Sequence, residues 1–286
     1  MDVVYAIQTI ATPWLDTVMT LVTDLGSEEA YIAMVIATYL AIDASAGQRL
    51  GVLLVTSFFL NQYAKGWFDT PRPFEIDPDL VRTQRALDGA TGAGFPSGHA
   101  QSSATFWLYA AVQAGRPWFW PVAVALVALV AFSRLYLGLH VPVDIVGGLA
   151  IGIALVLLAV VLERSGAQLP TWLLVAAAIG VPLALHLVFP TPESDLLAGA
   201  LGALVVAPIL VRHRTDGPWW GRVAIALIGV VLAFTVLVAS SVYLSEEVKR
   251  DPLGGYLRYL VLGLAGLALA PWIGRALGLA PEPRRR

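Results

Sequence analysis

The sequence predicts an all-α, polytopic transmembrane helical bundle. Of the 286 residues, 58% are hydrophobic and only 13% are charged, whereas a soluble domain of this length needs far more charge to cover its surface. Apolar runs of about twenty residues, the length that crosses the hydrocarbon core, recur along the chain. Lipid cannot satisfy open strand edges, so these runs are expected to be helices. The net charge of −2 points to neither nucleic acid nor a strongly acidic partner.

We expect about nine spans of near-bilayer length. Their approximate ranges are 28–44, 50–66, 98–114, 118–138, 141–162, 170–189, 196–211, 222–243 and 256–274. The segment 1–25 has apolar residues at helical spacing on one face and is predicted to be an amphipathic helix that lies on or dips into the membrane. It lacks the basic segment and compact apolar core of a cleaved signal peptide.

Basic residues predict the orientation of these spans. One set of loops and the C-terminal tail share a basic character, from Arg49, Arg116, Arg164, Arg212, Arg214, Arg222, Arg275 and 284–286. Alternate loops are acidic or mixed, so the basic set is expected in the cytoplasm. The loop at 67–97 and the turn at 138–141 are then expected at the extracytoplasmic face of the cytoplasmic membrane, and the C-terminus inside.

Three polar clusters interrupt the apolar chain, each at the outward end of a predicted span. The first is KGWFDTPRP at 65–73, and the second is GFPSGHA at 94–100. The third begins with Ser133-Arg134 and continues to His140 and Asp144. No predicted span separates the first two clusters, and two spans separate the second from the third. An even number of crossings returns the chain to the same side, so all three clusters are expected on one face of the membrane.

The cationic residues of these clusters suit a phosphate group. Lys65, Arg72 and Arg134 offer three positive charges to one dianion, and the guanidinium groups can bind phosphate oxygens through two hydrogen bonds at once. Ser97 is placed as the N-cap of the 98–114 helix. The first-turn N–H groups of that helix form an anion site, which Gly98 allows a ligand to approach closely.

The remaining residues suit nucleophilic catalysis. His140 and Asp144 are four residues apart at a helix start, hence on one face. Asp144 can accept the Nδ1 proton of His140 and leave the Nε2 lone pair free to attack phosphorus. His99 is left as the acid that protonates the departing oxygen. No carboxylate cluster or histidine pair at metal spacing accompanies them, and the chain has no cysteine, so we expect no metal and no cofactor.

These residues resemble the three-part signature of the type 2 phosphatidic acid phosphatase superfamily, the lipid phosphate phosphatases. That signature reads K-x6-R-P, then P-S-G-H, then S-R-x5-H-x3-D, and every fixed position is present here. The resemblance covers about residues 1–165 and implies a six-helix phosphatase core. The phosphate-binding residues that it implies are Lys65, Arg72, Ser97, Gly98 and Arg134. The catalytic residues that it implies are His140 as the nucleophile, Asp144 as its partner and His99 as the general acid.

We therefore expect residues 1–165 to hydrolyse a phosphomonoester or diphosphate of a lipid, through a phosphohistidine and without a metal. The leading substrates are polyprenyl (undecaprenyl) diphosphate, phosphatidate and phosphatidylglycerol phosphate, and the expected partners are this lipid and the surrounding membrane lipids. Two alternatives stay open. One is a lipid phosphotransferase with the same intermediate, and the other is a lipid transporter or scramblase. Residues 166–286 are a C-terminal transmembrane extension of unknown role, and the oligomeric state is open.

Polar residues outside the three clusters are expected to be structural. Arg82 and Arg85, in the acidic outer loop, should be solvated or salt-bridged. His186 and His213 should make structural hydrogen bonds. The Gly148–Gly152 pair should allow close helix packing inside the core.

Overall fold

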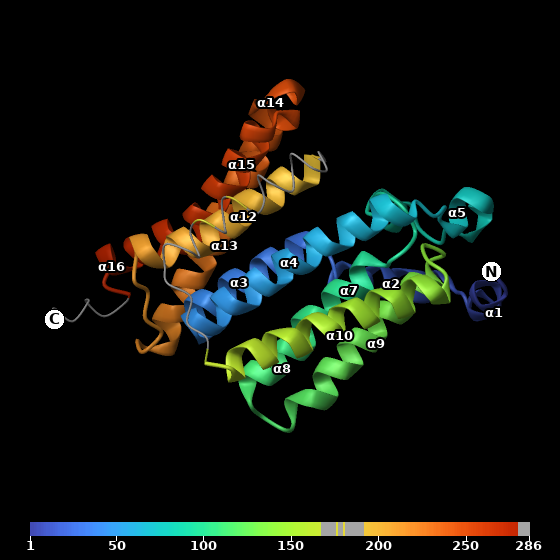
Figure 1. The fold of residues 1–286 in the computed structure, drawn as a ribbon, viewed down its shortest axis with the longest axis horizontal. Coiled ribbons are helices and arrows are strands. Elements are labelled where there is room, and N and C mark those ends of the chain that lie inside the picture. Colours follow the sequence, from blue (N-terminus) through green and yellow to red (C-terminus); the bar gives the residue numbers. More distant parts are fainter. Residues whose placement is uncertain (167–175, 177–179, 181–191, 280–286) are drawn as a thin grey trace. The chain divides into compact units, whose positions relative to one another are not determined.

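The computed structural model describes residues 1–166 and 192–279, with Ala176 and Gly180 between them, and Figure 1 shows its fold. Every regular element in these residues is a helix, which confirms the predicted all-α fold. The helices form two compact units. The first holds residues 1–31 and 56–166, and the second holds residues 32–55 and the described residues beyond 166.

The first unit contains all three motif clusters. Its elements are α1 (Asp2–Gln8), α2 (Pro13–Asp24), the start of α3 (Glu28–Ala37), the second half of α4 (Ala44–Phe68), α5 (Pro73–Ile76), the 3₁₀ turn η2 (Pro78–Leu80), α6 (Gln84–Asp88), α7 (Gly98–Ser103), the π-helical η3 (Ala104–Leu108), α8 (Tyr109–Ala114), α9 (Phe119–Tyr136) and α10 (Pro142–Arg164). The helices α7, η3 and α8 follow one another without a break and form one rod across 98–114.

The second unit packs α12 (Pro192–Leu210) along α15 (Pro252–Leu264). The approach is close, because a Cβ atom at Gly199 would lie 2.2 Å from the carbonyl oxygen of Tyr256. Its other elements are the end of α3, the π-helical η1 (Thr38–Ile42), the first half of α4, α13 (Trp219–Tyr243), α14 (Glu246–Arg250), the π-helical η4 (Ala265–Leu269) and α16 (Ala270–Ala276).

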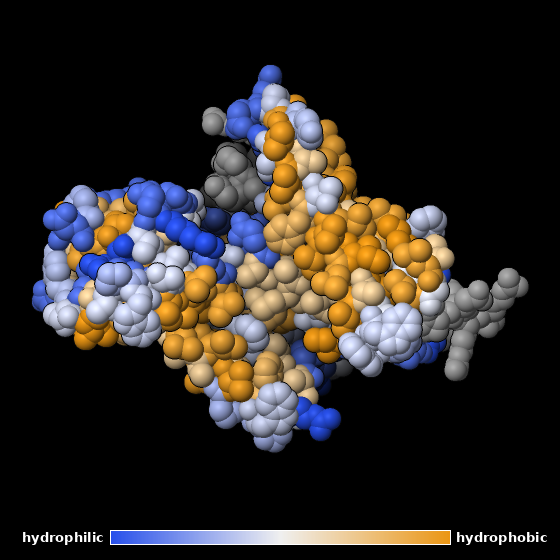
Figure 2. Space-filling model, turned by 180° about the vertical axis from the view of Figure 1, so that it is seen from behind, coloured by the Kyte–Doolittle hydropathy of each residue, from blue (hydrophilic) through white to orange (hydrophobic). Residues whose placement is uncertain are grey.

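Four helices in the described residues are long and apolar enough to cross a membrane, namely Phe119–Tyr136, Pro142–Arg164, Trp219–Tyr243 and Pro252–Ala276. They confirm the spans predicted at 118–138, 141–162, 222–243 and 256–274. A fifth span results if α2 and the helix Glu28–Ile42, bent by 51°, are counted together. Apolar side chains cover much of the surface seen in Figure 2, as lipid contact requires. The protein is a multi-pass membrane protein.

Other predicted spans take a different form. The span predicted at 50–66 lies within α4, a helix of 25 residues that is not among the four apolar helices. The helical rod at 98–114 is not among them either. Both bury polar side chains, such as Asn61 and Gln101. Leu197–Leu210 is a shorter apolar helix, and the span predicted at 170–189 lies outside the described residues. The segment 1–25 is two helices rather than one, since Pro13 starts a new helix at its first position.

Close packing between α7 and α10 holds two motif clusters together. A Cβ atom at Gly148 would lie 2.5 Å from the carbonyl oxygen of Ser97, and one at Gly152 would lie 2.6 Å from that of Gln101. The glycine pair therefore does allow close helix packing, as predicted. At the same crossing the Ser97 N–H donates to the carbonyl oxygen of Asp144 at 3.0 Å. The start of α7 is thereby tied to the start of α10.

Residues outside the clusters make the salt bridges and hydrogen bonds predicted for them where they are described. Arg82 binds Asp16 at 2.9 Å and Arg85 binds Asp24 at 2.6 Å, so both salt bridges reach α2 rather than acids of their own loop. In the second unit, His213 Nε2 lies 2.8 Å from the carbonyl oxygen of Leu40. His186 lies outside the described residues.

We expect Gly148→Ala to destabilise the protein. The new methyl group would meet a backbone oxygen at 2.5 Å, and such overpacking typically costs about 1–3 kcal/mol. Thermal unfolding in detergent should show a lower Tm. Gly66→Ala is the matched control, because a Cβ atom there meets nothing within 4 Å and alanine favours the helix. An unchanged Tm for Gly148→Ala would contradict the packing described.

Candidate active site

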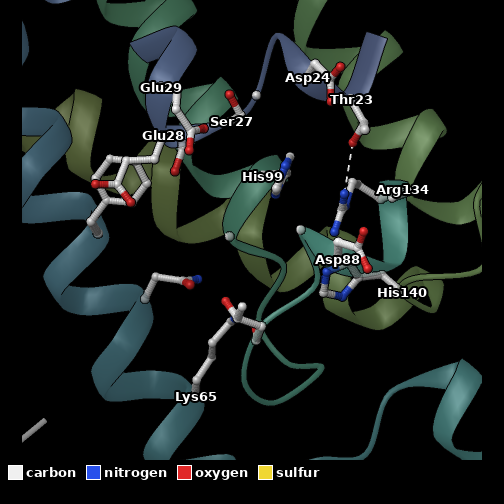
Figure 3. Close-up of a pocket in the computed structure, with 18 of the residues that line it drawn as sticks. Thr23, Asp24, Ser27, Glu28, Glu29, Lys65, Asp88, His99, Arg134 and His140 are labelled. Atoms are coloured by element: carbon white, nitrogen blue, oxygen red, sulfur yellow. Dashed lines mark hydrogen bonds between the residues drawn. The ribbon is translucent and has the colours of Figure 1, made fainter. Parts of the chain in front are cut away.

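A pocket of about 620 Å³ lies in the first unit where the three motif clusters meet (Figure 3). The predicted site residues that line it are Lys65, Arg72, Gly98, His99, Arg134 and His140. Ser97 and Asp144 are not part of the lining. Ser97 directly precedes Gly98, and Asp144 contacts His140. The structure therefore brings together all the residues that the sequence singled out.

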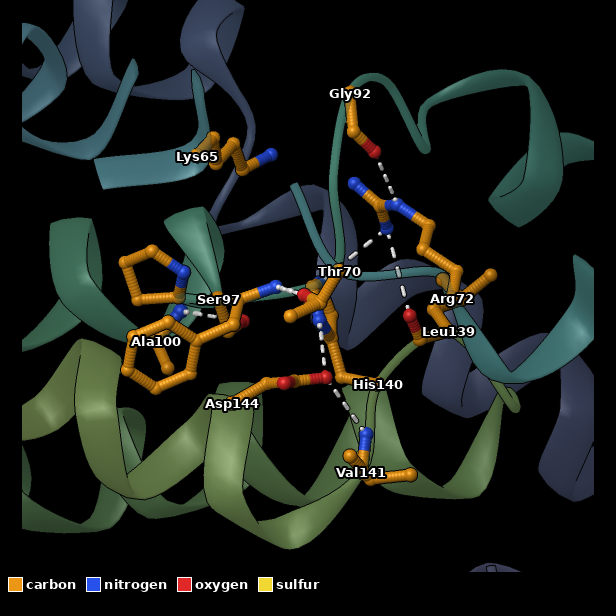
Figure 4. Close-up of polar contacts among 12 residues, drawn as sticks. Lys65, Thr70, Arg72, Gly92, Ser97, Ala100, Leu139, His140, Val141 and Asp144 are labelled. Atoms are coloured by element: carbon orange, nitrogen blue, oxygen red, sulfur yellow. Dashed lines mark hydrogen bonds and ion pairs between the residues drawn. The ribbon is translucent and has the colours of Figure 1, made fainter. Parts of the chain in front are cut away.

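Two of the cations are held by one loop. Arg72 donates from Nε to the carbonyl oxygen of Gly92 at 2.8 Å (Figure 4). It also donates from Nη2 to the carbonyl oxygen of Thr91 at 2.5 Å. Lys65 Nζ donates to the same Thr91 oxygen at 3.0 Å. Both side chains are buried, with 2% exposed for Arg72 and 9% for Lys65. Carbonyl groups orient these cations and leave their net charge for an anionic ligand.

His140 and Asp144 are positioned by the start of α10. Val141 is the N-cap, Pro142 follows it, and Asp144 occupies the third helical position. The Asp144 carboxylate lies 3.2 Å from His140 Nδ1 and accepts from the Val141 N–H at 3.0 Å. This contact assigns the proton to Nδ1 and a lone pair to Nε2 of the imidazole.

The unprotonated nitrogen of His140 faces the cations. Its Nε2 lies 3.4 Å from Arg72 Nη1, and the side chain is 1% exposed. Burial, followed by the charges of Arg134, Arg72 and Lys65, holds the pKa of His140 well below its usual range. The imidazole is therefore neutral at neutral pH, which is the form that a nucleophile needs.

The second cluster forms the N-terminus of the rod at 98–114. Ser97 is the N-cap, and its Oγ accepts from the Ala100 N–H at 3.5 Å. A Cβ atom at Gly98 would lie 3.0 Å from Asn61 Oδ1, so glycine is what lets α4 approach here. The N–H groups of a first helical turn have no acceptor within the helix, and here they adjoin the pocket with His99.

Arg134 is the most deeply buried cation of the pocket. It lies in the last turn of α9 and is 2% exposed. Nη1 donates to Thr23 Oγ1 at 2.9 Å, whereas Nε is buried and has no hydrogen-bond partner among the described residues. A buried cation without a counter-charge is unfavourable by itself, so this geometry fits the binding of an anion.

Two site residues were missed by the sequence analysis. Asn61 is buried and donates from Nδ2 to the carbonyl oxygen of Pro96 at 3.2 Å and to Gln101 Oε1 at 3.0 Å. The sequence contains an indication of this role, because Asn61 is a polar residue one helical turn before Lys65, on the same face of an apolar helix. Thr23 carried no such signal, because its contact with Arg134 joins residues 111 positions apart.

Comparisons with known proteins agree with this geometry. Residues 46–165 match the PAP2 superfamily, and residues 194–282 match the PAP2 superfamily phosphatase, transmembrane extension. The two matches together cover more than half of the chain. This protein belongs to the PAP2 superfamily. Both matches begin after residue 45, so α1, α2 and α3 lie outside them.

Several curated proteins are similar to about half of this PAP2 chain. Sphingosine-1-phosphate phosphatase 2 of Mus musculus is 31% identical over 140 residues, which are 47% of this chain and 38% of that protein. Undecaprenyl-diphosphatase of Sulfolobus acidocaldarius is 27% identical over 157 residues, 53% of this chain and 72% of that protein. Phosphatidylglycerophosphatase B of Bacillus subtilis is 26% identical over 159 residues, 51% and 74% of the two chains. The chain spans little more than a third of the mammalian relative.

A solved structure shares the fold. The crystal structure of a transmembrane PAP2 type phosphatidylglycerolphosphate phosphatase from Bacillus subtilis superposes with a TM-score of 0.51 at 24% sequence identity. The superposition covers 59% of this chain and 86% of that one.

In the described part of this chain, no group of three or more His, Asp or Glu residues is placed to hold a metal ion.

Proposed function

We propose that this protein is a lipid phosphatase that hydrolyses a phosphomonoester or diphosphate of a lipid through a phosphohistidine, without a metal. One observation carries the proposal: His140 presents Nε2 to a pocket where Lys65, Arg72 and Arg134 converge. A neutral imidazole beside three cations suits attack on an anionic phosphorus centre. The phosphate-binding set is completed by Ser97 and Gly98.

The first step transfers the phosphoryl group to His140. Its Nε2 attacks phosphorus and forms a P–N bond, while the bond to the lipid oxygen breaks. That oxygen takes a proton from His99, whose protonated form is stabilised by the negative charge of the bound substrate. Asp144 stabilises the imidazolium that forms, as a triad carboxylate does. The charge on the equatorial oxygens is offset by the cations and the helix N-terminus rather than by a metal.

The second step returns the enzyme to its starting state. Water attacks the phosphohistidine, His99 accepts a proton from it, and the P–N bond breaks to release inorganic phosphate. The Nε2 lone pair of His140 and the proton on His99 are then restored. A phosphotransferase would run the same step with the hydroxyl group of a second lipid in place of water.

A lipid substrate is supported by the membrane-spanning helices on which the site is built and by the names of the relatives. Those names mention undecaprenyl diphosphate, phosphatidylglycerophosphate and sphingosine-1-phosphate. We propose residues 1–165 as the catalytic part and residues 166–286 as a C-terminal transmembrane extension. The alternative of a lipid transporter or scramblase would assign the main activity to that extension.

We propose that the site lies on the extracytoplasmic face of the cytoplasmic membrane, with the C-terminus inside. The chain has no cysteine, so single cysteines can report the topology. A membrane-impermeant maleimide should modify Asp79→Cys or Asp88→Cys in intact cells, whereas Asp216→Cys should react only after the cells are opened. The reverse labelling pattern would place the site in the cytoplasm.

The proposed roles of the two histidines predict different defects. His140→Ala removes the nucleophile, so no phosphoenzyme should form from any substrate. His99→Ala removes the acid, and its effect should depend on the leaving group. An aryl phosphate, whose phenolate departs without a proton, should still phosphorylate His140 in the His99→Ala variant, whereas a lipid phosphate should not.

This difference can be measured by trapping acid-labile phosphate on the purified variants with a labelled aryl phosphate. The label should accumulate on His99→Ala, because hydrolysis of the phosphoenzyme also needs His99 as a base. His213→Ala, a histidine of the second unit, is the matched control and should behave as wild type. Equal loss of the label from His99→Ala and His140→Ala would show that the division of roles is wrong.

The absence of a metal from the mechanism gives a further expectation. Release of phosphate from a panel of lipid phosphates should persist in excess EDTA, because Lys65, Arg72 and Arg134 offset the charge on the phosphoryl group. Vanadate, which becomes five-coordinate when a histidine nitrogen binds it, should inhibit wild type. Loss of activity in EDTA with recovery on adding Mg²⁺ would falsify the metal-free site.

A further inference from the structure

The bend between α2 and α3, defined as residues 23–29, forms one wall of the pocket. The lining residues that it contributes are Thr23, Asp24, Gly26, Ser27, Glu28 and Glu29. Figure 3 shows Thr23 and Asp24 on the Arg134 side of the pocket and Glu28 and Glu29 on the other side, with His99 between them. The bend precedes the matched segment at 46–165. None of the three motif clusters includes it.

Thr23 holds the most buried cation. Its side-chain oxygen accepts from Arg134 Nη1 at 2.9 Å, and Thr23 itself is 3% exposed (Figure 3). A carboxylate at this position would orient the guanidinium group but would also offset its charge. A hydroxyl group orients the guanidinium group and leaves the full positive charge for a phosphate. The unpartnered Nε of Arg134 in the same pocket is then available as a donor.

Gly26 lies against the proposed general acid. A Cβ atom at Gly26 would lie 3.1 Å from His99 Cδ2 and 2.9 Å from Val130 Cγ1. The imidazole of His99 therefore lies so near the bend that no side chain fits between them at this position. A larger residue would push the ring or separate α2 from α9. One short bend thus contacts both the acid and the deepest cation of the site.

The other end of α2 is anchored to the same helix as Arg134. Asp16 accepts from the Tyr136 hydroxyl at 2.6 Å and from Arg82 Nη2 at 2.9 Å. Gln8, on α1, donates to the carbonyl oxygen of Tyr136 at 2.9 Å. Tyr136 follows Arg134 by two residues on α9. These bonds set the position of α2 along α9, and hence the position of Thr23 beside Arg134.

We propose that the α2–α3 bend is a functional part of the site, in which Thr23 is the positioning residue for Arg134 and Gly26 the positioning residue for His99. This inference rests on the proposed phosphatase function. It assigns a role in phosphate binding to a segment outside the superfamily motifs. The two positions can be told apart in the phosphorylation step, because Arg134 binds every phosphate whereas His99 is needed there only when the leaving group is poor.

Thr23→Val tests the positioning of Arg134 by Thr23, because valine keeps the shape of the side chain and removes the hydrogen-bond acceptor. A hydrogen bond to a charged group typically contributes about 1.5–3 kcal/mol, and losing one at the lower end corresponds to about tenfold. We expect kcat/KM to fall at least about tenfold for aryl and lipid phosphates alike, and inorganic phosphate to inhibit more weakly by a similar factor. Thr23→Ser should restore both.

The control is Thr17→Val on the same helix. Thr17 is exposed, and its hydroxyl group donates to the carbonyl oxygen of Pro13 at 3.1 Å, away from the pocket. This variant should match wild type in both measurements. A Thr23→Val enzyme with unchanged kcat/KM and unchanged inhibition by phosphate would overturn the role of Thr23. So would a Thr23→Ser enzyme as impaired as Thr23→Val.

Gly26→Ala tests the positioning of His99 by Gly26 through the leaving group. It should slow formation of the phosphoenzyme from a lipid phosphate about tenfold or more, a part of the 10²–10⁴-fold that a positioned acid contributes, and leave formation of the phosphoenzyme from an aryl phosphate near wild type. Equal effects on both substrates would overturn the role of Gly26. If Gly26→Ala does not fold, the comparison of Thr23→Val with Thr23→Ser decides the proposal.

A wild-type protein that binds phosphate but hydrolyses neither substrate would refute the proposed function. Phosphate binding by Thr23→Val would still test the role of the bend.

Discussion

The site depends on keeping three cations close together in a buried pocket. Removing an ion from water costs several kcal/mol, and like charges at short range repel one another. In this protein, neutral hydrogen-bond acceptors offset part of the cost of burying the cations. The carbonyl oxygens of Thr91 and Gly92 accept from Lys65 and Arg72, and the Thr23 hydroxyl accepts from Arg134. Such partners hold these three cations in place without offsetting their charge, which leaves that charge for an anionic substrate.

The same positive field determines the state of the histidine. His140 is buried beside the cations, so its protonated form is disfavoured and its pKa is lowered. Asp144 orients the ring through Nδ1 at 3.2 Å, and its second acceptor role toward the Val141 N–H fixes the carboxylate in turn. A neutral, oriented imidazole among cations is a consequence of burial as much as of residue type.

Helix packing supplies the geometry that this electrostatic arrangement needs. Gly148 and Gly152 let α10 lie very close to α7. Any larger residue at either position would place its Cβ atom against a backbone oxygen of the facing helix. Glycine at 98 does the same between α7 and Asn61 on α4. The nucleophile, the helix N-terminus and Lys65 come from three helices, so small residues at these crossings decide whether they share one pocket.

The sequence by itself determined the helical fold, four of the spans and the set of motif residues that meet in the pocket. These depend on local geometry: His140 and Asp144 touch because residues four apart share a helix face, and Ser97 caps because it precedes a helix. Only the tertiary structure decided that Thr23, from a segment without a motif, holds Arg134 across 111 positions, and that residues 32–55 belong with the C-terminal helices. Contacts of that kind depend on how whole helices pack, and no run of neighbouring residues encodes them.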